Sequence, residues 1–302
     1  SISMQQVAII GAGQLGRRHL QGLVKSSHPI SVHIVDPFEV SRCAVQEFIA
    51  TQEAGLLPSI QIHASIKELP PELDLVIVAT TSSQRMEVIE NLVSVSKVRH
   101  LVLEKFLFDN SEHYERTESL IAALGITCWV NTPRRHFSIY RKIREENRED
   151  RLLQVTVDGG GWGLCCNSVH FIDLVQFLSG NVDLLTMDTH LDEGGVVSKR
   201  EGFVELTGEL SGYVGSTQFC IRSIRNSIKP ITVALHYQHQ SVFVVEGSET
   251  LIRVGQGGVT TESFKLPYQS EMTGMIADQL FNSNICDLTP YRSEEHTSEL
   301  QS

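Results

Sequence analysis

The chain has 302 residues, of which 41% are hydrophobic and 20% are charged, and its formal net charge is −11. This composition is typical of a soluble globular protein and excludes a disordered chain, while the length favours two domains over one. The acidic balance argues against a nucleic-acid partner, because no basic stretch stands out against it.

Two further features of the sequence predict a cytoplasmic protein. The sequence has no apolar run of about 18 residues and no signal peptide, so we expect neither a membrane partner nor secretion. Its six cysteines include no C-x-x-C pair and no metal-ligand spacing. We therefore expect a reducing compartment and no metal site.

The first predicted elements surround a glycine-rich turn. An apolar strand over residues 7–10 leads into Gly11-Ala12-Gly13-Gln14-Leu15-Gly16, and a helical pattern follows directly. In a G-x-G-x-x-G turn the first glycine permits the bend, the second lets backbone amides approach a pyrophosphate, and the third allows close helix–strand packing. The helix N-terminus also offers unpaired N–H groups to phosphates. We predict a dinucleotide-binding turn; the alternative is a purely structural one.

A carboxylate follows the second predicted strand. That strand covers residues 30–35 and is followed by Asp36, about 20 residues beyond the glycines, where dinucleotide-binding proteins hold the ribose hydroxyls. A carboxylate there would also repel the 2′-phosphate of NADP. We therefore predict NAD as the cofactor, with NADP as the alternative because Arg42 is close in sequence.

Strands and helices then alternate as far as residue 131. Strands are predicted over 60–63, 73–79, 101–103 and 126–130, and helices over 39–52 and 84–96. This alternation predicts a doubly wound parallel sheet of the Rossmann type, in which ligand groups gather beyond the carboxyl ends of the strands. Polar and charged residues lie at these ends and complete the predicted cofactor site, namely Thr80, Thr81, Ser82, Glu104, Lys105 and Asn131.

The pattern changes after a helix predicted over 139–147. Strands are predicted over 152–157, 202–210, 213–224, 231–237, 241–245 and 250–254, with a hairpin turn at Gly247-Ser248. Helices are predicted only over 168–178, where Gly180 follows the end, and over 270–281. We therefore expect an NAD-binding domain over 4–131 and an α+β domain with a large, mostly antiparallel open sheet over 132–291.

The last eleven residues, 292–302, do not continue this pattern. They look like the in-frame translation of a sequencing-adapter oligonucleotide, so we expect a non-native tail and leave it out of the site.

Several motifs together resemble one protein family. GAGQLGRRHL, VDP, LVIVATTSS, LEKF, NTPRR and VHFIDLVQFLSG are similar to segments of the glucose–fructose oxidoreductase and inositol dehydrogenase (Gfo/Idh/MocA) family. The resemblance covers about residues 4–291. It implies a nucleotide-binding domain followed by an open antiparallel sheet, an active site between them, and NAD(P)-dependent oxidation or reduction of a sugar or cyclitol carbon. The block GGGWGLCCNSVHFIDL further resembles members from surface-polysaccharide gene clusters.

The resemblance implies two catalytic residues. Lys105 matches the lysine of the family's E-K-P motif, with Phe106 in place of the proline, and His170 matches the catalytic histidine. An ammonium at a strand end would stabilise charge on a substrate oxygen, and an imidazole suits proton transfer near neutral pH. The alternatives are an ordinary Glu104–Lys105 surface pair and a structural histidine.

The sequence departs from the family pattern just before the histidine. The family often has an aspartate four residues earlier, where this chain has Cys166, and Asn167 would supply only hydrogen bonds. Asp173 is three residues beyond His170, on the same helical face, where it would orient the imidazole or pack against the nucleotide domain. A thiol nucleophile at Cys166 is an alternative without support from its sequence neighbours.

Three more residues are candidate substrate contacts. Arg134 and Arg135 match a family arginine pair and would hold a carboxylate or phosphate bidentately; the alternative is a solvated basic turn. Trp162 would stack on a sugar face, with core packing as the alternative.

These observations predict an NAD-dependent oxidoreductase that transfers a hydride to or from a sugar or sugar-nucleotide hydroxyl or ketone carbon. Lys105 and His170 are expected to converge on the oxygen of the reacting carbon. One alternative is a non-catalytic NAD-binding sensor or scaffold, which the missing aspartate favours. Another is a relative that uses transient oxidation for elimination or glycoside cleavage. We also expect a homodimer or homotetramer, as the resemblance and a broad sheet face suggest.

Overall fold

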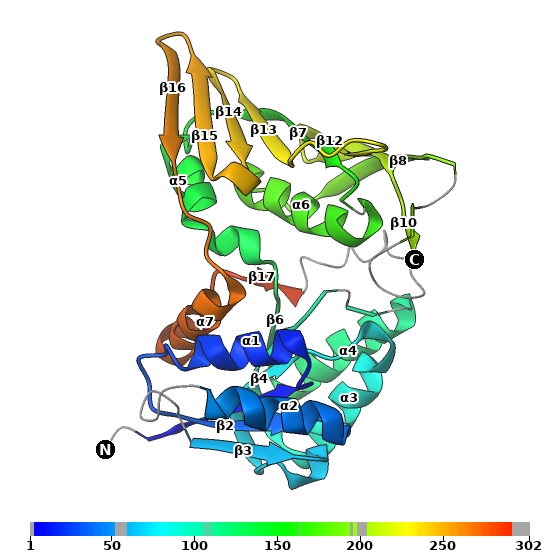
Figure 1. The fold of residues 1–302 in the computed structure, drawn as a ribbon, viewed down its shortest axis with the longest axis vertical. Helices are drawn as coiled ribbons and strands as arrows, with labels where there is room; N and C mark the ends of the chain where they lie inside the picture. Colours follow the sequence, from blue (N-terminus) through cyan, green and yellow to red (C-terminus); the bar gives the residue numbers. More distant parts are fainter. Residues whose placement is uncertain are drawn as a thin grey trace. The chain divides into compact units, whose positions relative to one another are not determined.

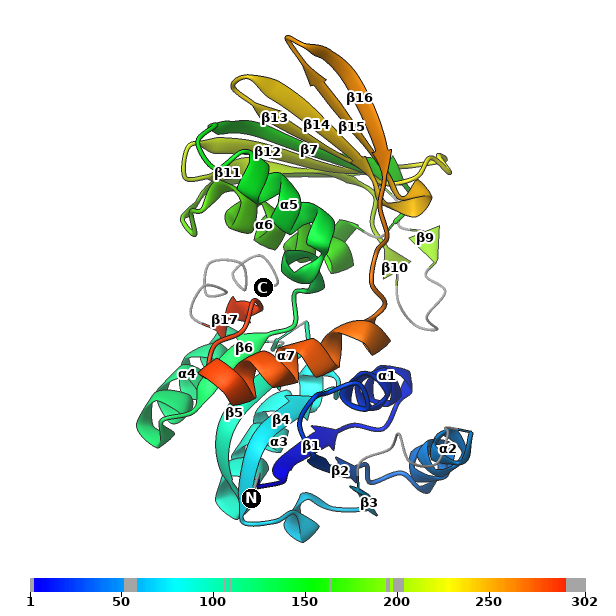
Figure 2. The ribbon, with the colours of Figure 1, turned by 90° about the vertical axis from the view of Figure 1, so that its left-hand side faces the viewer.

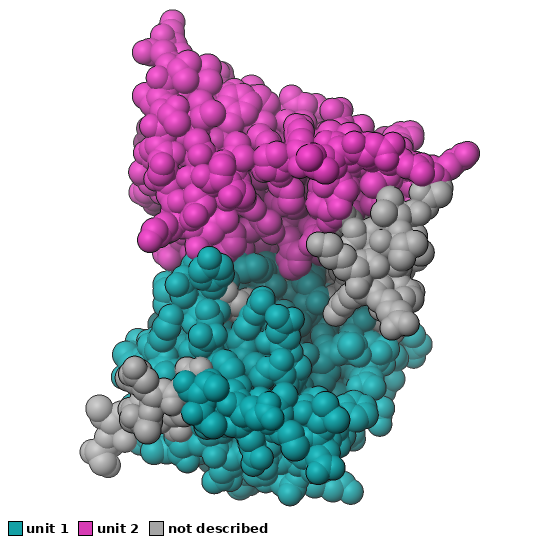
Figure 3. All heavy atoms as spheres, in the orientation of Figure 1, with its two compact units in different colours: residues 1–133, 267–302 teal, residues 134–266 magenta. Residues whose placement is uncertain are grey.

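The computed structural model describes residues 3–51, 59–105, 107–108, 110–162, 164–193, 196–197 and 204–291. The chain forms two compact units (Figure 3). Unit 1 contains residues 1–133 together with 267–302, and unit 2 contains residues 134–266. The predicted tail, residues 292–302, lies outside the described residues.

Unit 1 is built on a seven-stranded sheet (Figure 1). In spatial order its strands are β17 (Thr289–Pro290), β6 (Thr127–Val130), β5 (Lys97–Leu103), β4 (Glu72–Val78), β1 (Gln5–Ile10), β2 (Ile30–Val35) and β3 (Ser59–His63). All pairs are parallel except β17 with β6. The strand order reverses between β1 and β4, which brings the ends of both to the point where doubly wound sheets bind ligands. The predicted Rossmann sheet is confirmed.

Helices cover both faces of this sheet (Figures 1 and 2). One face carries α1 (Gln14–Leu23), α2 (Glu39–Ala50) and α7 (Gln269–Ser283), and the other carries α3 (Ser82–Val95) and α4 (Ser111–Leu124). Strand residues buried on both sides form two apolar clusters, which explains why β1 and β4 read as continuous hydrophobic runs.

Helix α4 was not predicted, although its sequence carries ordinary helix signals. The Asn110 side chain caps its N-terminus by accepting hydrogen bonds from the amides of Glu112 and His113. Gly125, at φ +65°, ends it in the left-handed conformation that glycine favours.

Unit 2 is an eight-stranded open sheet with helices on one face (Figure 2). Its spatial order is β16 (Gly258–Ser263), β15 (Thr250–Gly255), β14 (Gln240–Val245), β13 (Thr232–Tyr237), β7 (Leu152–Gly160), β12 (Thr217–Ile224), β11 (Gly208–Val214) and β8 (Leu184–Leu191). Only the β7–β12 pair of this sheet is parallel. The helices are α5 (Ser138–Glu146) and α6 (Leu164–Ser179). The predicted, mostly antiparallel open sheet is confirmed.

Some strand limits in unit 2 differ from the prediction. The strand predicted over 202–210 is divided into the short β10 (Val204–Glu205) and the start of β11, and β10 pairs with β9 (Val196–Val197) outside the main sheet. Strands β8 and β16 were not predicted. The connection at Gly247-Ser248 is a 3₁₀ turn over Glu246–Ser248, followed by Glu249 in a left-handed conformation.

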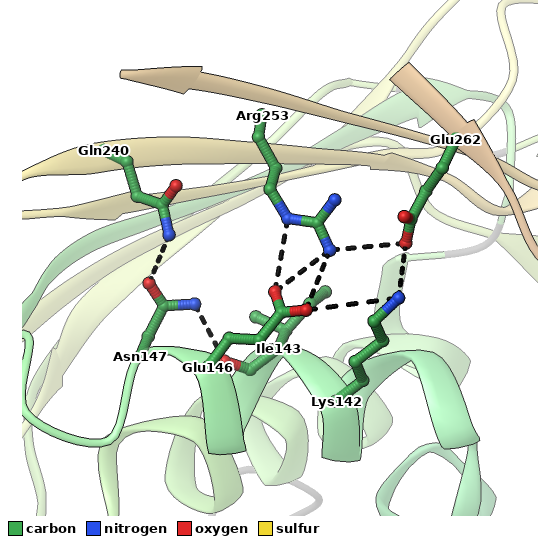
Figure 4. Close-up of polar contacts among 7 residues, drawn as sticks. All are labelled: Lys142, Ile143, Glu146, Asn147, Gln240, Arg253 and Glu262. Atoms are coloured by element: carbon green, nitrogen blue, oxygen red, sulfur yellow. Dashed lines mark hydrogen bonds and ion pairs between the residues drawn. The ribbon is translucent and has the colours of Figure 1, made fainter. Parts of the chain in front are cut away.

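Charged and polar contacts attach α5 to one end of this sheet (Figure 4). Arg253 on β15 binds the Glu146 carboxylate and lies 3.3 Å from Glu262 on β16. Lys142 lies 3.1 Å from Glu262 and 4.0 Å from Glu146. Next to them Gln240 donates to Asn147, which itself donates to the Ile143 carbonyl one turn back.

The compact units differ from the predicted domains at the C-terminal end. We predicted a second domain over 132–291, but the chain returns to unit 1 at residue 267. Helix α7 packs closely on α1. The contact is so close that a Cβ on Gly274 would lie only 2.5 Å from the Gly22 carbonyl oxygen. In the described part of the chain, no helix is long and apolar enough to cross a membrane.

Candidate active site

The glycine turn after β1 has the geometry that the motif predicts. Gly11 has φ +104°, a conformation that L side chains rarely adopt. A Cβ on Gly16 would lie 1.9 Å from the Gly11 carbonyl oxygen, so only glycine permits this approach of helix and turn. A Cβ on Gly13 would meet no atom within 4 Å, so its backbone faces open space. The Gly11 amide donates to the Val35 carbonyl at 2.8 Å, so the exposed Gly13, directly before α1, is the part of the turn that is open to a ligand.

Asp36 lies at the end of β2 and is held against this turn. Its Oδ2 accepts a hydrogen bond from the Ala12 amide at 2.8 Å, and its Oδ1 accepts one from the Phe38 amide at 2.9 Å. Arg42 donates to the Asp36 main-chain carbonyl at 2.9 Å. The carboxylate is therefore fixed in direction, and the nearby guanidinium binds the backbone beside it.

A cavity of about 790 Å³ opens beside the turn and Asp36. A cavity of this size is in the range of small-molecule and cofactor sites. Its wall includes five residues of the predicted cofactor set, namely Gly11, Gly13, Asp36, Thr80 and Thr81. Phe38, Lys67 and Gln84 also line it. An accessible glycine turn, an adjoining helix N-terminus and a fixed carboxylate at one cavity fit a dinucleotide.

A buried polar network lies at the carboxyl ends of β5 and β6. Glu104 is buried, and its Oε1 lies 2.6 Å from His19 Nε2. Asn131 donates to the same oxygen at 2.9 Å, and His19 Nδ1 lies 2.9 Å from Thr273 Oγ1 on α7. Glu104 and Asn131, both predicted as cofactor residues, thus contact each other.

Arg85 on α3 joins the ends of β4 and β5. Its guanidinium is buried and donates to the carbonyl oxygens of Thr80, Glu104 and Leu107 at 2.5, 2.5 and 3.0 Å. The sequence analysis singled out neither Arg85 nor His19 nor Thr273. His19 follows Gly16 by three residues, and that spacing is the one local signal for its inward position.

Lys105 directly follows Glu104 and is half-buried. The alternative of an ordinary surface pair is wrong for Glu104, because its carboxylate is buried and binds His19 and Asn131. Ser82 begins α3, and Gln14 and Leu15 begin α1.

In unit 2, His170 lies on α6 among fixed neighbours. Asn167, one turn earlier, donates to the Trp162 carbonyl at 2.8 Å. The Trp162 indole donates to the Arg222 carbonyl at 2.8 Å and packs edge-to-face on Phe171. The Trp162 ring is therefore anchored within unit 2. The side chain of Cys166 lies outside the described residues.

In unit 2 the arginine pair binds two buried carboxylates, those of Asp173 and Glu246. Asp173 is fully buried, and its two oxygens accept from Arg135 Nε at 3.0 and 2.9 Å. Arg134 binds Glu246 bidentately, with both distances 2.9 Å, and the Tyr140 hydroxyl donates to the same carboxylate. The alternative of a solvated basic turn is wrong, because both guanidinium groups bind carboxylates inside unit 2.

Burial and charge act in opposite directions on the Arg134 group. Burial favours the neutral form, but the adjacent Glu246 carboxylate outweighs it and raises the pKa of Arg134 above its ordinary value. Burial raises the pKa of Tyr140 well above its ordinary value, and the Glu246 charge adds to this. Arg134 is therefore a permanent cation neutralised by Glu246. Among the described side chains, no cluster of three or more His, Cys, Asp and Glu residues is arranged to hold a metal.

Comparison with known proteins agrees with this geometry. Residues 5–132 match the Gfo/Idh/MocA model, which describes an oxidoreductase family with an NAD-binding Rossmann fold. The resemblance to the Gfo/Idh/MocA family found in the motifs is confirmed over these residues. No curated protein sequence matches the chain.

Several solved structures align with nearly the whole chain. A scyllo-inositol dehydrogenase from Lactobacillus casei with bound NAD(H) and scyllo-inositol is 14% identical, with TM-score 0.73, over 99% of this chain and 95% of the other. UDP-N-acetylglucosamine 3-dehydrogenase from Acidithiobacillus ferrooxidans is 16% identical, with TM-score 0.75, over 99% and 96%. A transcriptional regulator from Kluyveromyces lactis is 13% identical, with TM-score 0.76, over 99% and 88%. At these identities the likeness is one of fold.

Proposed function

We propose that the protein is an NAD-dependent oxidoreductase that transfers a hydride to or from a hydroxyl or ketone carbon of a sugar or sugar nucleotide. One observation carries the proposal: the cavity wall in unit 1 combines Gly11 and Gly13 of the glycine turn with the fixed Asp36 carboxylate. Amide groups at a helix N-terminus bind phosphates, and a carboxylate at the end of the second strand binds ribose hydroxyls.

The preference for NAD over NADP rests on the charges at this wall. The Asp36 carboxylate would repel a 2′-phosphate, and Arg42 already donates to a main-chain carbonyl. Lys67 also lines the cavity and is the cation that would favour NADP instead. We give Asp36 the greater weight because two backbone amides fix its carboxylate.

We assign the chemistry to Lys105 and His170. The nicotinamide group, when bound, supplies the hydride acceptor or donor. In the oxidation direction His170 would take the proton of the substrate hydroxyl, and Lys105 would stabilise the developing alkoxide. Asn167 and Trp162 lie on the segment that leads to His170 and are our candidates for substrate orientation.

The substrate class is proposed from similarity. Two proteins with this fold are named as dehydrogenases of scyllo-inositol and of UDP-N-acetylglucosamine, both polyhydroxylated compounds. The motif block around His170 further suggests a sugar nucleotide of surface-polysaccharide synthesis. Arg134 and Arg135 bind Glu246 and Asp173, so we assign them to the support of the site in unit 2 in place of anion capture.

A second candidate function is an NAD-binding sensor or scaffold without turnover. It is favoured by the cysteine at position 166, where the family often has an aspartate, and by a structural neighbour named as a transcriptional regulator. A panel of sugars and nucleotide sugars, screened for NADH absorbance, separates the two functions. Turnover that is lost in His170→Ala supports the enzyme, whereas NADH binding without turnover on the whole panel supports the sensor.

We also propose self-association as a homodimer or homotetramer through the sheet of unit 2. Strand register places a row of residues on the sheet face opposite α5 and α6, namely Leu185, Tyr213, Gln218, Gln154, His236, Ser241, Val254 and Val259. Its outer members Leu185, Tyr213, Val254 and Val259 are all exposed. Exposed apolar residues on a broad sheet face favour association. Light scattering during size-exclusion chromatography tests this, and a monomeric mass would contradict it.

A further inference from the structure

The polar side chains that lie beneath the strand ends in unit 1 form a continuous chain. Thr273 on α7 contacts His19 on α1, His19 contacts Glu104 after β5, and Asn131 after β6 donates to Glu104. We propose that this Thr273–His19–Glu104–Asn131 relay is a positioning device. Through it, the position of α7 determines the position of the backbone after β5, which carries Lys105 and borders the cavity. The proposal rests on the function proposed above for the cofactor and Lys105.

Both ends of the His19 ring are engaged, so the ring has a single orientation. Its Nε2 lies 2.6 Å from Glu104 Oε1 and its Nδ1 lies 2.9 Å from Thr273 Oγ1, and the ring is 2% exposed. Buried polar groups that lose one partner keep the full cost of their lost hydration. Movement of the Thr273 hydroxyl would therefore change the orientation of the His19 ring and its hydrogen bond to the Glu104 carboxylate.

Glu104 is held through its main chain as well. Arg85 Nη1 donates to the Glu104 carbonyl at 2.5 Å, and Nη2 of the same guanidinium donates to the Thr80 carbonyl at 2.5 Å. Thr80 lines the cavity. The relay therefore continues from the Glu104 side chain, through its backbone and Arg85, to the cavity wall. It acts on the backbone and not on the Lys105 ammonium.

Because α7 packs closely on α1, the Thr273 hydroxyl lies within hydrogen-bond distance of His19. A Cβ on Gly22 would lie 2.7 Å from Thr273 Cβ, so glycine is required on α1 at this contact. A separate contact anchors the middle of α7: the Asp278 carboxylate accepts hydrogen bonds from Ser26 and from the Ser27 amide. Of these two polar contacts of α7, the one through Thr273 leads to the strand ends and the one through Asp278 does not.

The need to hold α7 on α1 does not by itself account for the relay. Apolar side chains would hold two helices together at least as well as a buried carboxylate and imidazole, whose removal from water is costly. Asp278, at the surface, already supplies a polar anchor. Glu104, the buried carboxylate that binds His19, immediately precedes Lys105 in the chain. This placement is explained if the Glu104–His19 pair fixes the backbone at Lys105.

Three variants test the proposal on the full chain. Thr273→Val removes the hydroxyl at nearly constant volume, and Thr273→Ser restores it. Asp278→Ala is the matched control, because it loosens α7 without touching the relay. The readouts are NADH affinity by fluorescence titration, thermal midpoint, and hydrogen–deuterium exchange of the unliganded peptide that contains Glu104 and Lys105.

We expect Thr273→Val to weaken NADH binding about tenfold and to speed exchange at the Glu104–Lys105 peptide. Thr273→Ser should retain most of the affinity. Asp278→Ala should lower the thermal midpoint but leave both other readouts near wild type. The proposal is overturned if Asp278→Ala weakens NADH as much as Thr273→Val, or if Thr273→Val changes neither readout.

The exchange measurement separates this proposal from the proposed function. If the wild-type chain does not bind NADH, the proposed function fails. Faster exchange in Thr273→Val than in Asp278→Ala would still support the relay in that case. Equal exchange in the two variants would overturn it.

Discussion

The Ala12 amide donates a hydrogen bond to the Asp36 carboxylate at 2.8 Å and thereby joins the glycine turn to the end of the second strand. These residues lie 24 positions apart in the sequence. The bond has two consequences. It stabilises the turn that would hold the pyrophosphate, and it directs a negative charge along the wall of the cavity where the ribose would bind.

Asp36→Ala should therefore weaken NADH binding more than NADPH binding. Loss of a charge-assisted hydrogen bond corresponds to about tenfold to a hundredfold in affinity. NADPH should be affected less, or should bind more tightly, because the repulsion of its 2′-phosphate is lost. Parallel fluorescence titrations with both cofactors measure this, with Arg42→Met as the control for the neighbouring cation. Tighter NADPH than NADH binding in the wild type, unchanged in Asp36→Ala, would refute the assignment.

His170→Ala should lower turnover by about 10²–10⁴-fold on a verified substrate, since general-base assistance has this magnitude. Cofactor affinity should change little, because the proposed role of His170 is to take the substrate proton. Lys105→Ala should also lower turnover, since its interaction strengthens as charge develops on the oxygen.

The matched control for these two variants is Cys166→Ala. It alters the position where the family often has an aspartate, and we expect it to cost far less than either. The assay is the initial rate of NADH formation at saturating NAD. Equal rates for wild type and His170→Ala would remove the proposed mechanism and favour the sensor.

Local signals predicted much of unit 1. Gly11 and Gly16 were assigned from their spacing and from the strand and helix patterns on either side, and the structure gives each a backbone reason to be glycine. The reason is that a strand, a tight turn and a helix lie within a few residues of one another. Helix α4 was not predicted, although Asn110 and Gly125 are ordinary signals for the start and the end of a helix.

The long-range contacts of the site could not be predicted. Thr273 contacts His19 across 254 residues, and Arg134 contacts Glu246 across 112. No periodicity or motif relates positions so far apart, so Arg134 read equally well as an anion clamp or a surface turn. For the same reason the return of α7 to unit 1 was not foreseen.

Glu246→Gln should destabilise unit 2 strongly, because it leaves the buried Arg134 cation without its counter-charge. Removing one partner of a buried pair costs about 3–5 kcal/mol. Tyr140→Phe is the control: it removes one hydrogen bond to the same carboxylate and should cost about 1 kcal/mol. Chemical denaturation of the full chain measures both. Similar, small losses in the two variants would show that Arg134 does not depend on Glu246.

Arg253→Met should destabilise the contact of α5 with β15 and β16 in a pH-dependent way. Hydrogen bonds from Arg253, with a further contribution from Lys142, hold the pKa of Glu262 below its ordinary value of 4.5. A carboxyl group whose pKa is lower in the folded chain stabilises it above the unfolded pKa, and this contribution is lost as the pH falls through the folded value.

The Arg253→Met variant should therefore lose about 1 kcal/mol at pH 7, the upper range for partly exposed pairs, and less below about pH 4. Added salt should also reduce the difference from wild type. Arg148→Met is the matched control, because Arg148 pairs with Glu145 on the exposed surface and should cost almost nothing. Thermal unfolding of the three proteins at pH 7 and at pH 3 measures the effect. A difference between Arg253→Met and wild type that is equal at both pH values would mean that the Glu262 charge does not stabilise this contact, and the network in Figure 4 would then act through packing alone.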